Sequence, residues 1–353
     1  MPILTATELA LFASRLFQAA GVPTADADLV AESLVGANLR GHDSHGVMRV
    51  PQYVDFLDRG EYRTGVELSV EHETPAVVVC EANWGLGQVQ AHRLLDLILP
   101  KAKAIGLAAG AARHCGHIGR LGEYAERAAS EGLILIATVN NDGAGNRVAP
   151  PGGTQGRLAT NPLCAGVPTE EEPVVLDFGT SVAAEGKVRV HYINKTAVPD
   201  GWLLGPDGRP TTDPAVLYEP PLGSILPMGG TQAYKGFGLS LVLDMLSGGL
   251  TGGHSSRAGA PPAKGNNVVF LALDPTQFAG RDWMLQEATA LGHYVRGCPR
   301  AEGVEKIMLP GDPERAMLQR RSAFGIPLED AHWSRLTALA ERLQVPCPAV
   351  DKP

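Results

Sequence analysis

The sequence predicts an α+β fold in which a sheet-containing core lies between two helical ends. Apolar residues recur with helical spacing over residues 5–60, and short apolar runs typical of strands follow. Helical periodicity returns over residues 331–343. We therefore expect a helical N-terminal segment (residues 1–74), an α+β core (residues 75–275) and a C-terminal segment (residues 276–353) that packs with the N-terminal helices.

Three helices are predicted in the N-terminal segment. Thr5 and Glu8 have the spacing of a capping box, which predicts a first helix that ends before Gly21. A second helix is expected over residues 25–39 and a third over residues 44–60. Together they carry more apolar surface than they can bury among themselves, so we expect them to pack against a later part of the chain.

The core is predicted to alternate strands with helices. Strands are expected at residues 76–80, 107–112, 133–139, 174–178, 187–190 and 268–273. Helices are expected at residues 88–103, 121–130 and 237–246, and a last one at residues 331–343.

Composition narrows the functional classes. The 353 residues are 44% hydrophobic, enough for two domains with real cores, and the net charge is -8 without any basic run. We therefore expect neither nucleic acid nor a membrane as the main partner. Five scattered cysteines without a CxxC pair indicate reduced thiols, and no signal-like or membrane-spanning segment is evident, so we expect a cytoplasmic protein.

The most informative segment contains His45, Arg49 and Tyr53. If the third helix begins near Ser44, these residues share one face at i, i+4 and i+8, which predicts the wall of a cleft. Histidine is the usual acid or base in alcohol–carbonyl chemistry, and a guanidinium can hold a carboxylate with two hydrogen bonds. The pattern suggests a small 2-hydroxy or 2-oxo acid as the substrate. The alternative is that the histidine is an ordinary structural residue.

Two glycine-rich segments are candidate cofactor sites. Residues 85–91 follow a predicted strand as a dinucleotide fingerprint would, but no acidic residue lies about 20 positions later to hold a ribose. Residues 113–124 lead into a predicted helix and include Arg120. Either they bind a diphosphate at the N-terminus of this helix, or they form a simple glycine-rich turn. The sequence does not decide between these two interpretations of the second segment.

A metal site is a further hypothesis. His42 and His45 form one HxxH pair, and His114 and His117 form another, so four imidazoles could converge in a metal-dependent hydrolase. Neither pair has the i, i+4 spacing of zinc-binding helices, and no carboxylate is evidently placed to complete the site. We therefore expect no metal. A catalytically silent metabolite-binding protein is the other alternative.

Taken together, six ordered motifs resemble those of the malate/L-lactate dehydrogenase family that lacks a Rossmann fold, and the resemblance extends from Leu9 to Leu328. The motifs are Ser44-His45-Gly46 with Arg49 and Tyr53, residues 148–153 with Thr160-Asn161-Pro162, residues 177–187, residues 199–202 with 211–214, residues 229–236, and Pro310-Gly311-Asp312.

The resemblance implies an antiparallel, non-Rossmann cofactor sheet, a homodimer, and NAD or NADP as the cofactor. It assigns His45 as the general acid/base, Ser44 as its partner, and Arg49 as the carboxylate clamp. His117 would assist catalysis, and Tyr53 and Thr160 would contact a small carboxylate substrate. The implied cofactor contacts are His117, Ile118, Gly119, Arg120, Leu121, Asn140, Asp177, Phe178, Gly179, Gly229, Lys235, Pro310, Gly311, Asp312 and Arg315.

Two positions depart from the family pattern. Lys187 occupies a place in the catalytic relay where the cyclic imine reductases of the family tend to carry an aspartate. Gly179 replaces a more usual alanine. The expected function is hydride transfer between a nicotinamide cofactor and a small 2-hydroxy/2-oxo acid. The alternative within the family is reduction of cyclic imino acids such as piperideine- or pyrroline-2-carboxylate.

Overall fold

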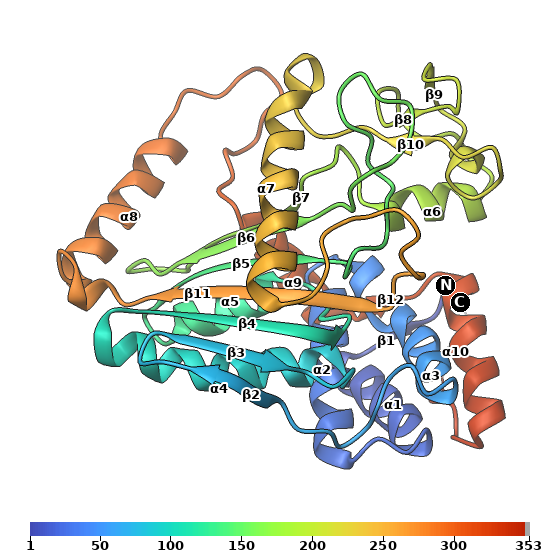
Figure 1. Cartoon of the computed structure of the whole chain (residues 1–353), viewed down its shortest axis with the longest axis horizontal. Coiled ribbons are helices and arrows are strands. Elements are labelled where there is room, and N and C mark those ends of the chain that lie inside the picture. Colours follow the sequence, from blue (N-terminus) through green and yellow to red (C-terminus); the bar gives the residue numbers. More distant parts are fainter. Residues whose placement is uncertain (350–353) are drawn as a thin grey trace.

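A seven-stranded sheet forms the centre of the molecule (Figure 1). The computed structural model describes residues 1–349 of the chain. In spatial order the strands are β2 (Ser69–Glu73), β3 (Val77–Glu81), β4 (Leu107–Gly116), β11 (Gly265–Leu273), β5 (Ile134–Asn140), β6 (Pro162–Val167) and β7 (Val174–Gly179). Only β3 and β4 pair in parallel, and every other neighbouring pair is antiparallel. The predicted non-Rossmann, mostly antiparallel sheet is therefore confirmed.

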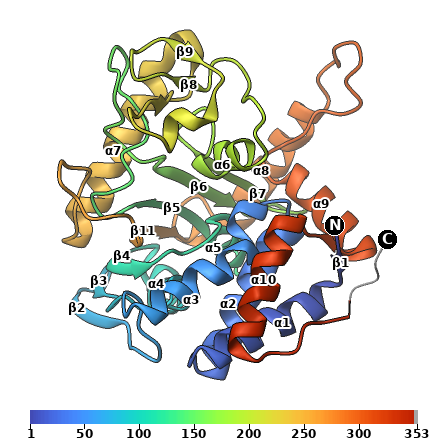
Figure 2. The same cartoon turned by 90° about the vertical axis from the view of Figure 1, so that its right-hand side faces the viewer.

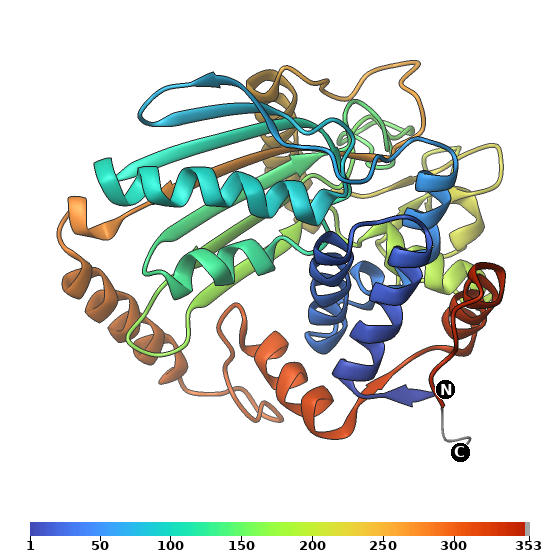
Figure 3. The same ribbon diagram turned by 90° about the horizontal axis from the view of Figure 1, so that it is seen from below.

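Helices cover both faces of this sheet. α4 (Gly87–Ile105) and α5 (Gly122–Ser130) lie on one face, and α7 (Ala233–Thr251) crosses the other (Figures 1 and 3). Between the sheet and α5, the buried rings of Tyr124 and Phe270 lie 5.4 Å apart, and burial of each contributes about 2 kcal/mol. Within residues 1–349, no helix has both the length and the apolar character needed to cross a membrane.

The two ends of the chain form one helical unit (Figure 2). Its elements are β1 (Ile3–Leu4), α1 (Ala6–Ala19), α2 (Thr24–Leu39), α3 (Val50–Asp58), β12 (Ile326–Pro327) and α10 (Asp330–Leu343). β1 pairs with β12, and α10 packs against α1 and α3. The expected capping box is present, since the Thr5 and Glu8 side chains each accept the other residue's backbone N–H.

A small lobe stands between β7 and α7. It contains α6 (Glu185–Ile193) and a three-stranded sheet of β10 (Ser224–Ile225), β8 (Leu203–Leu204) and β9 (Pro210–Thr211). The predicted strand at residues 187–190 is wrong, because this segment lies within α6. Alternating charged residues and valines imitate a strand, yet only Val188 is buried and Arg189 pairs with Glu185 one helical turn away.

Several elements were not predicted from the sequence. α8 (Arg281–Arg296) and α9 (Asp312–Phe324) bury almost none of their side chains, and apolar residues of α8 such as Trp283 and Tyr294 remain exposed. β6 begins at Pro162 and contains Gly166, which together suggest a loop. Gly166 is needed because a Cβ there would lie 2.8 Å from the Cβ of Ala125 in α5. These segments therefore depend on partners distant in sequence.

Candidate active site

The turn after α2 places the first catalytic candidates. The predicted continuous helix over residues 44–60 is wrong, because two short 3₁₀ turns, Asp43–His45 and Val47–Arg49, precede α3. Asn38 fixes this turn by accepting the N–H of Val47 at 2.8 Å and donating to Asp43 at 2.6 Å. A Cβ at Gly46 would lie 2.2 Å from Asn38 Oδ1, so glycine is required there.

Arg321 of α9 holds the same turn from the other end of the chain. Its guanidinium forms two hydrogen bonds with the Asp43 carboxylate, at 2.6 and 2.9 Å, and also donates to the Asn38 carbonyl. Such a bidentate pair fixes geometry as well as charge. No local pattern in the sequence indicates this contact, because the two residues lie 278 positions apart.

His45 and His117 lie face to face. Their ring centroids are 5.5 Å apart, with 21° between the ring planes. The Ser44 hydroxyl lies 3.0 Å from His45 Nδ1. His117 directly follows β4, and α4 packs tightly behind it because a Cβ at Gly87 would lie 2.3 Å from the His117 carbonyl oxygen. The glycines at residues 85–91 therefore serve close packing behind the histidine.

A buried hydrogen-bond chain orients His117. Gln88 Nε2 donates to the Tyr53 hydroxyl at 3.2 Å, and this hydroxyl lies 2.6 Å from His117 Nδ1. The Gly119 backbone N–H also points at Nδ1, from 3.3 Å. Because a backbone N–H can only donate, Nδ1 is the acceptor and the ring proton resides on Nε2. Tyr53 consequently donates its proton to Nδ1.

Tyr53 has a different place from the one predicted. Its side chain is fully buried and does not line the cavity described below, so it positions His117 instead of forming the wall of a cleft. Burial raises the pKa of Tyr53 to about 12, which keeps the phenol protonated.

Both imidazoles are neutral in the free protein. Burial and the nearby positive charge of Arg49 lower the pKa of His45 to about 3. Burial, Arg49 and the His45 ring hold the pKa of His117 well below its ordinary value. Neutral His45 can therefore accept a proton from an alcohol, and His117 offers its Nε2–H as a hydrogen-bond donor.

A cavity of 660 Å³ joins most of the predicted catalytic and substrate-binding residues. Ser44, His45, Arg49, His117 and Thr160 all line it. Arg49 donates through Nε to the Ser44 carbonyl at 2.7 Å and through Nη1 to Gln52 at 2.8 Å. Its Nη2 has no partner among residues 1–349, so it is free for a ligand.

Lys187 is not brought to this cavity. Its side chain is exposed in the first turn of α6, while Glu185, Gly186 and Arg189 line the cavity. A Cβ at Gly186 would lie 3.0 Å from the Ser44 Cβ, so the backbone of α6 packs closely against the turn that contains Ser44. The structure thus gives Lys187 no contact with His45.

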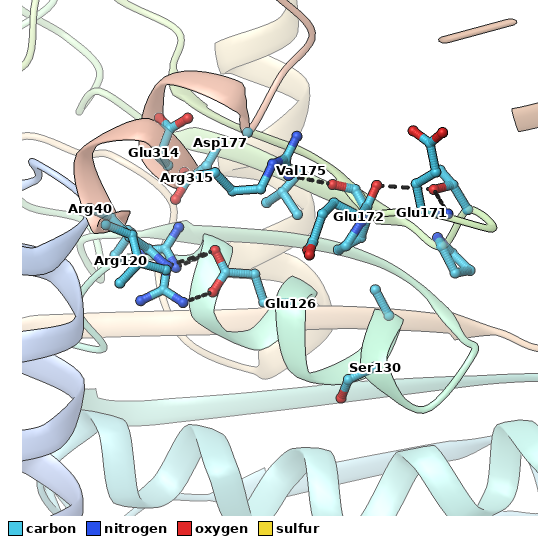
Figure 4. A pocket seen from close by; sticks show the side chains of 16 residues that line it. Arg40, Arg120, Glu126, Ser130, Glu171, Glu172, Val175, Asp177, Glu314 and Arg315 are labelled. Carbon is cyan, nitrogen blue, oxygen red and sulfur yellow. Dashed lines mark hydrogen bonds and ion pairs between the residues drawn. The ribbon is translucent and has the colours of Figure 1, made fainter. Parts of the chain in front are cut away.

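A second cavity, of 320 Å³, collects part of the predicted cofactor set (Figure 4). Arg120, Asp177, Gly311 and Arg315 line it, together with Arg40, Glu126 and Glu314. Two features place this cavity near the residues of the 660 Å³ cavity. Glu314 lies 3.1 Å from His42 Nε2, two residues before Ser44, and Arg120 follows His117 by three residues.

Asp177 contributes a buried carboxyl group to this second cavity. Its Oδ2 accepts the N–H of Gly122, at the start of α5, at 2.7 Å. Burial raises the pKa of Asp177 although Gly122 and Arg120 act in the opposite direction. Oδ1 has no hydrogen-bond partner in the described part of the chain.

The other predicted cofactor residues lie elsewhere. Ile118 and Leu121 are buried in the core, and Asn140 donates its amide to Asp244 at 2.6 Å. The adjacent Asn141, which the sequence did not single out, lines the 660 Å³ cavity instead. Asp312 pairs with two arginines at the start of α9. The residues that line neither the 660 Å³ nor the 320 Å³ cavity also include Gly119, Phe178, Gly179, Gly229, Lys235 and Pro310.

The four histidines of the HxxH pairs do not converge. His42 contacts Glu314, and His114 Nδ1 lies 2.9 Å from Glu81. Only His45 and His117 remain together. The alternative hypothesis that all four imidazoles converge is therefore contradicted, and residues 1–349 contain no group of three or more His, Cys, Asp or Glu side chains placed to hold a metal.

Comparison with known proteins shows the family of the chain. Residues 4–337 match the family model described as malate/L-lactate dehydrogenase. Hydroxycarboxylate dehydrogenase B of Escherichia coli O157:H7 is 34% identical over 340 residues, which is 95% of this chain and 92% of that protein.

Two solved structures have the same architecture. Malate dehydrogenase from Pyrococcus horikoshii OT3 superposes with a TM-score of 0.88 at 30% identity, covering 98% of this chain and 97% of that one. A Δ1-piperideine-2-carboxylate reductase from Pseudomonas syringae gives 0.83 at 30% identity, covering 96% and 100%. The protein is therefore an oxidoreductase, and the chain belongs to the malate/L-lactate dehydrogenase family.

Proposed function

We propose that the protein transfers a hydride reversibly between a nicotinamide cofactor and a small 2-hydroxy/2-oxo acid. The observation that carries this proposal is the stacked His45–His117 pair beside Arg49 in one cavity of 660 Å³. An anion clamp next to two neutral proton-exchanging groups is the arrangement that alcohol–carbonyl chemistry on a carboxylic acid requires.

Each residue of the cavity has a role in this reaction. Arg49 binds the substrate carboxylate through its free Nη2. The Nε2–H of His117 donates a hydrogen bond to the substrate oxygen. During oxidation neutral His45 takes the hydroxyl proton of the alcohol and becomes an imidazolium. During reduction the His45 imidazolium, which takes its proton from solvent once the substrate carboxylate is bound to Arg49, gives this proton to the carbonyl oxygen. A bound nicotinamide supplies the hydride in one direction and accepts it in the other.

The 320 Å³ cavity suits the adenosine end of the cofactor. Asp177 and Glu314 offer carboxylate oxygens for ribose hydroxyls, which is the usual role of an acidic residue at an NAD site. A 2′-phosphate needs an unpaired cation, but Arg40 and Arg120 both bind Glu126 (Figure 4), and Arg315 binds Asp312. We therefore assign NAD, and not NADP, as the preferred cofactor.

The cyclic imine alternative has weaker support. The piperideine-2-carboxylate reductase structure shares the fold, so the fold does not separate the two activities. In the relay position, however, Lys187 is exposed and does not line the cavity, and the backbone of Gly186 lies close to Ser44. Glu185 does line the cavity but is paired with Arg189 at 2.8 Å. This arrangement favours an oxo acid.

We also infer a cytoplasmic homodimer. Val242 and Met245 on α7 and Trp283 and Tyr294 on α8 are exposed, and α8 stands away from the body of the molecule (Figure 1). Apolar surface of this kind is typical of a subunit contact. All five cysteines are free thiols, as expected in a reducing compartment. Light scattering coupled to size-exclusion chromatography tests the dimer, and a monomeric mass would contradict it.

The activity is tested by mixing the protein with NADH and a panel of 2-oxo acids and cyclic imines. Loss of the near-ultraviolet absorbance of NADH with an oxo acid supports the proposal. Turnover restricted to cyclic imines would favour the alternative. Absence of turnover with every compound would overturn the proposal.

A further inference from the structure

The 660 Å³ cavity is strongly positive. Five cationic residues line it, and Glu185 is the one carboxylate among its described lining residues. The cationic residues are Arg49, Arg147, Arg189, Arg257 and Lys264. Glu185 is paired with Arg189, so four cations have no carboxylate partner within residues 1–349. This concentration of positive charge is notable in a chain with a net charge of -8.

Two of these cations come from elements that do not carry Arg49. Arg147 lies in the segment after β5 and is tied to the small lobe, because its Nη1 donates to the Leu217 carbonyl at 2.6 Å. Arg257 lies in the loop after α7, and its Nε would be 3.4 Å from a Cβ placed on Gly143. The Arg257 guanidinium has no hydrogen bond to any residue in the described range. Both groups are therefore available for an anion.

Asn146 links these two arginines. It precedes Arg147 in the chain and donates its Nδ2 to the Arg257 carbonyl at 3.2 Å. Its Oδ1 is buried and has no partner in the part of the chain that the structure describes. Asn146 also lines the cavity. A buried acceptor without a donor is costly in an empty site, and the hydroxyl of a bound 2-hydroxy acid is a donor that could satisfy it.

Lys264 is already engaged in another contact. Its Nζ lies 3.9 Å from the centroid of the Trp84 ring, where a cation–π interaction stabilises it. A substrate monocarboxylate would occupy Arg49 alone and leave Arg147 and Arg257 without counter-charge. A second negative group on the same substrate would neutralise them.

We propose that Arg147 and Arg257 form a second anion subsite, so that the preferred substrate is a dianionic 2-oxo or 2-hydroxy acid. One carboxylate binds Arg49, and a second carboxylate or sulfonate binds Arg147 and Arg257. This inference rests on the proposed function for its reaction, although the anion subsite can be tested by binding alone.

The test compares the wild-type protein with Arg257→Gln. The kcat/KM for oxaloacetate divided by that for pyruvate is expected to fall by about 10- to 100-fold, as for loss of one charged hydrogen-bonded contact. Arg147→Lys, which keeps the charge but loses the planar guanidinium, is expected to lower the same ratio less.

Arg209→Gln is the matched control, because the Arg209 side chain is 87% exposed on the small lobe. Thermal unfolding of each variant establishes that it is folded.

The cofactor diphosphate is the other anion that could use these cations. If Arg257→Gln weakens NADH binding while the oxaloacetate-to-pyruvate ratio stays unchanged, the cations serve the diphosphate and the inference is overturned. An unchanged ratio together with unchanged NADH binding also overturns it.

A binding measurement separates this inference from the proposed reaction. Calorimetry with hydroxymalonate, a dianion, and glycolate, a monoanion, is expected to show tighter binding of hydroxymalonate that Arg257→Gln abolishes. If no oxo acid is turned over, the proposed function fails, yet this result would still support the subsite. If turnover occurs but the wild-type protein binds both anions equally, the subsite inference fails alone.

Discussion

The Tyr53 hydroxyl lies 2.6 Å from His117 Nδ1, although the two residues belong to different structural units. Tyr53 is part of α3 in the helical unit, and His117 follows the central strand β4. This hydrogen bond therefore helps to orient the His117 imidazole and links the helical unit to the sheet.

Tyr53→Phe is expected to lower kcat by about 10- to 100-fold with little change in KM. The ring still fills its site, but His117 Nδ1 keeps only the longer hydrogen bond from the Gly119 N–H, so the imidazole is oriented less firmly. Loss of the hydrogen bond should reduce the free energy of unfolding by about 1 kcal/mol. Steady-state kinetics and thermal unfolding measure the two effects.

The partly buried Tyr192, whose hydroxyl donates only to Glu219, provides the control Tyr192→Phe. Its kcat should match that of the wild-type protein. If Tyr53→Phe behaves like this control, Tyr53 does not position His117.

Ligand binding is expected to be coupled to proton uptake. Burial and, to a smaller extent, the charge of Arg49 lower the pKa of His45 to about 3 in the free protein, so the ring is neutral above that pH. A carboxylate bound to Arg49 cancels part of the positive charge and raises this pKa toward its ordinary value. At a pH between these two values, the complex therefore binds more protons than the free protein.

Calorimetry of oxamate binding to the protein with NADH, in buffers of different ionisation enthalpy, measures this uptake. Arg49→Gln removes the charge that lowers the pKa, so it should reduce both affinity and proton uptake. Proton release on binding to the wild-type protein would contradict the account.

NADH is expected to bind at least about tenfold more tightly than NADPH, because the guanidiniums of the second cavity are already paired. Glu126→Gln should reduce this difference in affinity by strengthening NADPH binding, since it removes the charge that neutralises Arg40 and Arg120. Fluorescence titration with each reduced cofactor gives the two dissociation constants.

Glu131→Gln is a suitable control at a surface ion pair with Lys103. In this variant the ratio of the dissociation constants for NADPH and NADH should equal that of the wild-type protein. Tighter binding of NADPH than NADH by the wild-type protein would contradict the assignment of NAD.

Arg321→Gln tests whether the C-terminal segment holds the catalytic turn. Loss of the bidentate pair with Asp43 should lower the free energy of unfolding by about 1 kcal/mol and reduce kcat, because Ser44 and His45 follow Asp43 directly. The neighbouring Arg320 is exposed and makes no ion pair with residues 1–349, so Arg320→Gln should alter neither quantity. Equal kcat values in the two variants would show that the pair is dispensable for catalysis.

The sequence predicted those parts of the molecule that depend on local patterns or complete motifs. The Thr5–Glu8 capping box follows from spacing alone. His45, Arg49, His117 and Thr160 were recognised from motifs, and one cavity brings them together. The antiparallel sheet followed from the family resemblance, because no periodicity in the chain specifies how strands are paired.

Other features could not be predicted because distant contacts determine them. The break between the 3₁₀ turns depends on Asn38 fitting against Gly46, and the helix α6 depends on packing in the small lobe. Arg321 contacts Asp43, which lies 278 positions earlier in the sequence. Asn140 and Asn141 look equivalent in the sequence, yet strand register turns the first toward Asp244 and leaves the second at the cavity.

The most direct test is the oxidation of NADH by oxaloacetate with the wild-type protein, His45→Asn and His117→Asn. The account predicts that the wild-type protein consumes NADH and that each substitution lowers kcat by about 10²- to 10⁴-fold. The account would be contradicted if both variants had the kcat of the wild-type protein. It would also be contradicted if the wild-type protein bound NADH but did not oxidise it with oxaloacetate.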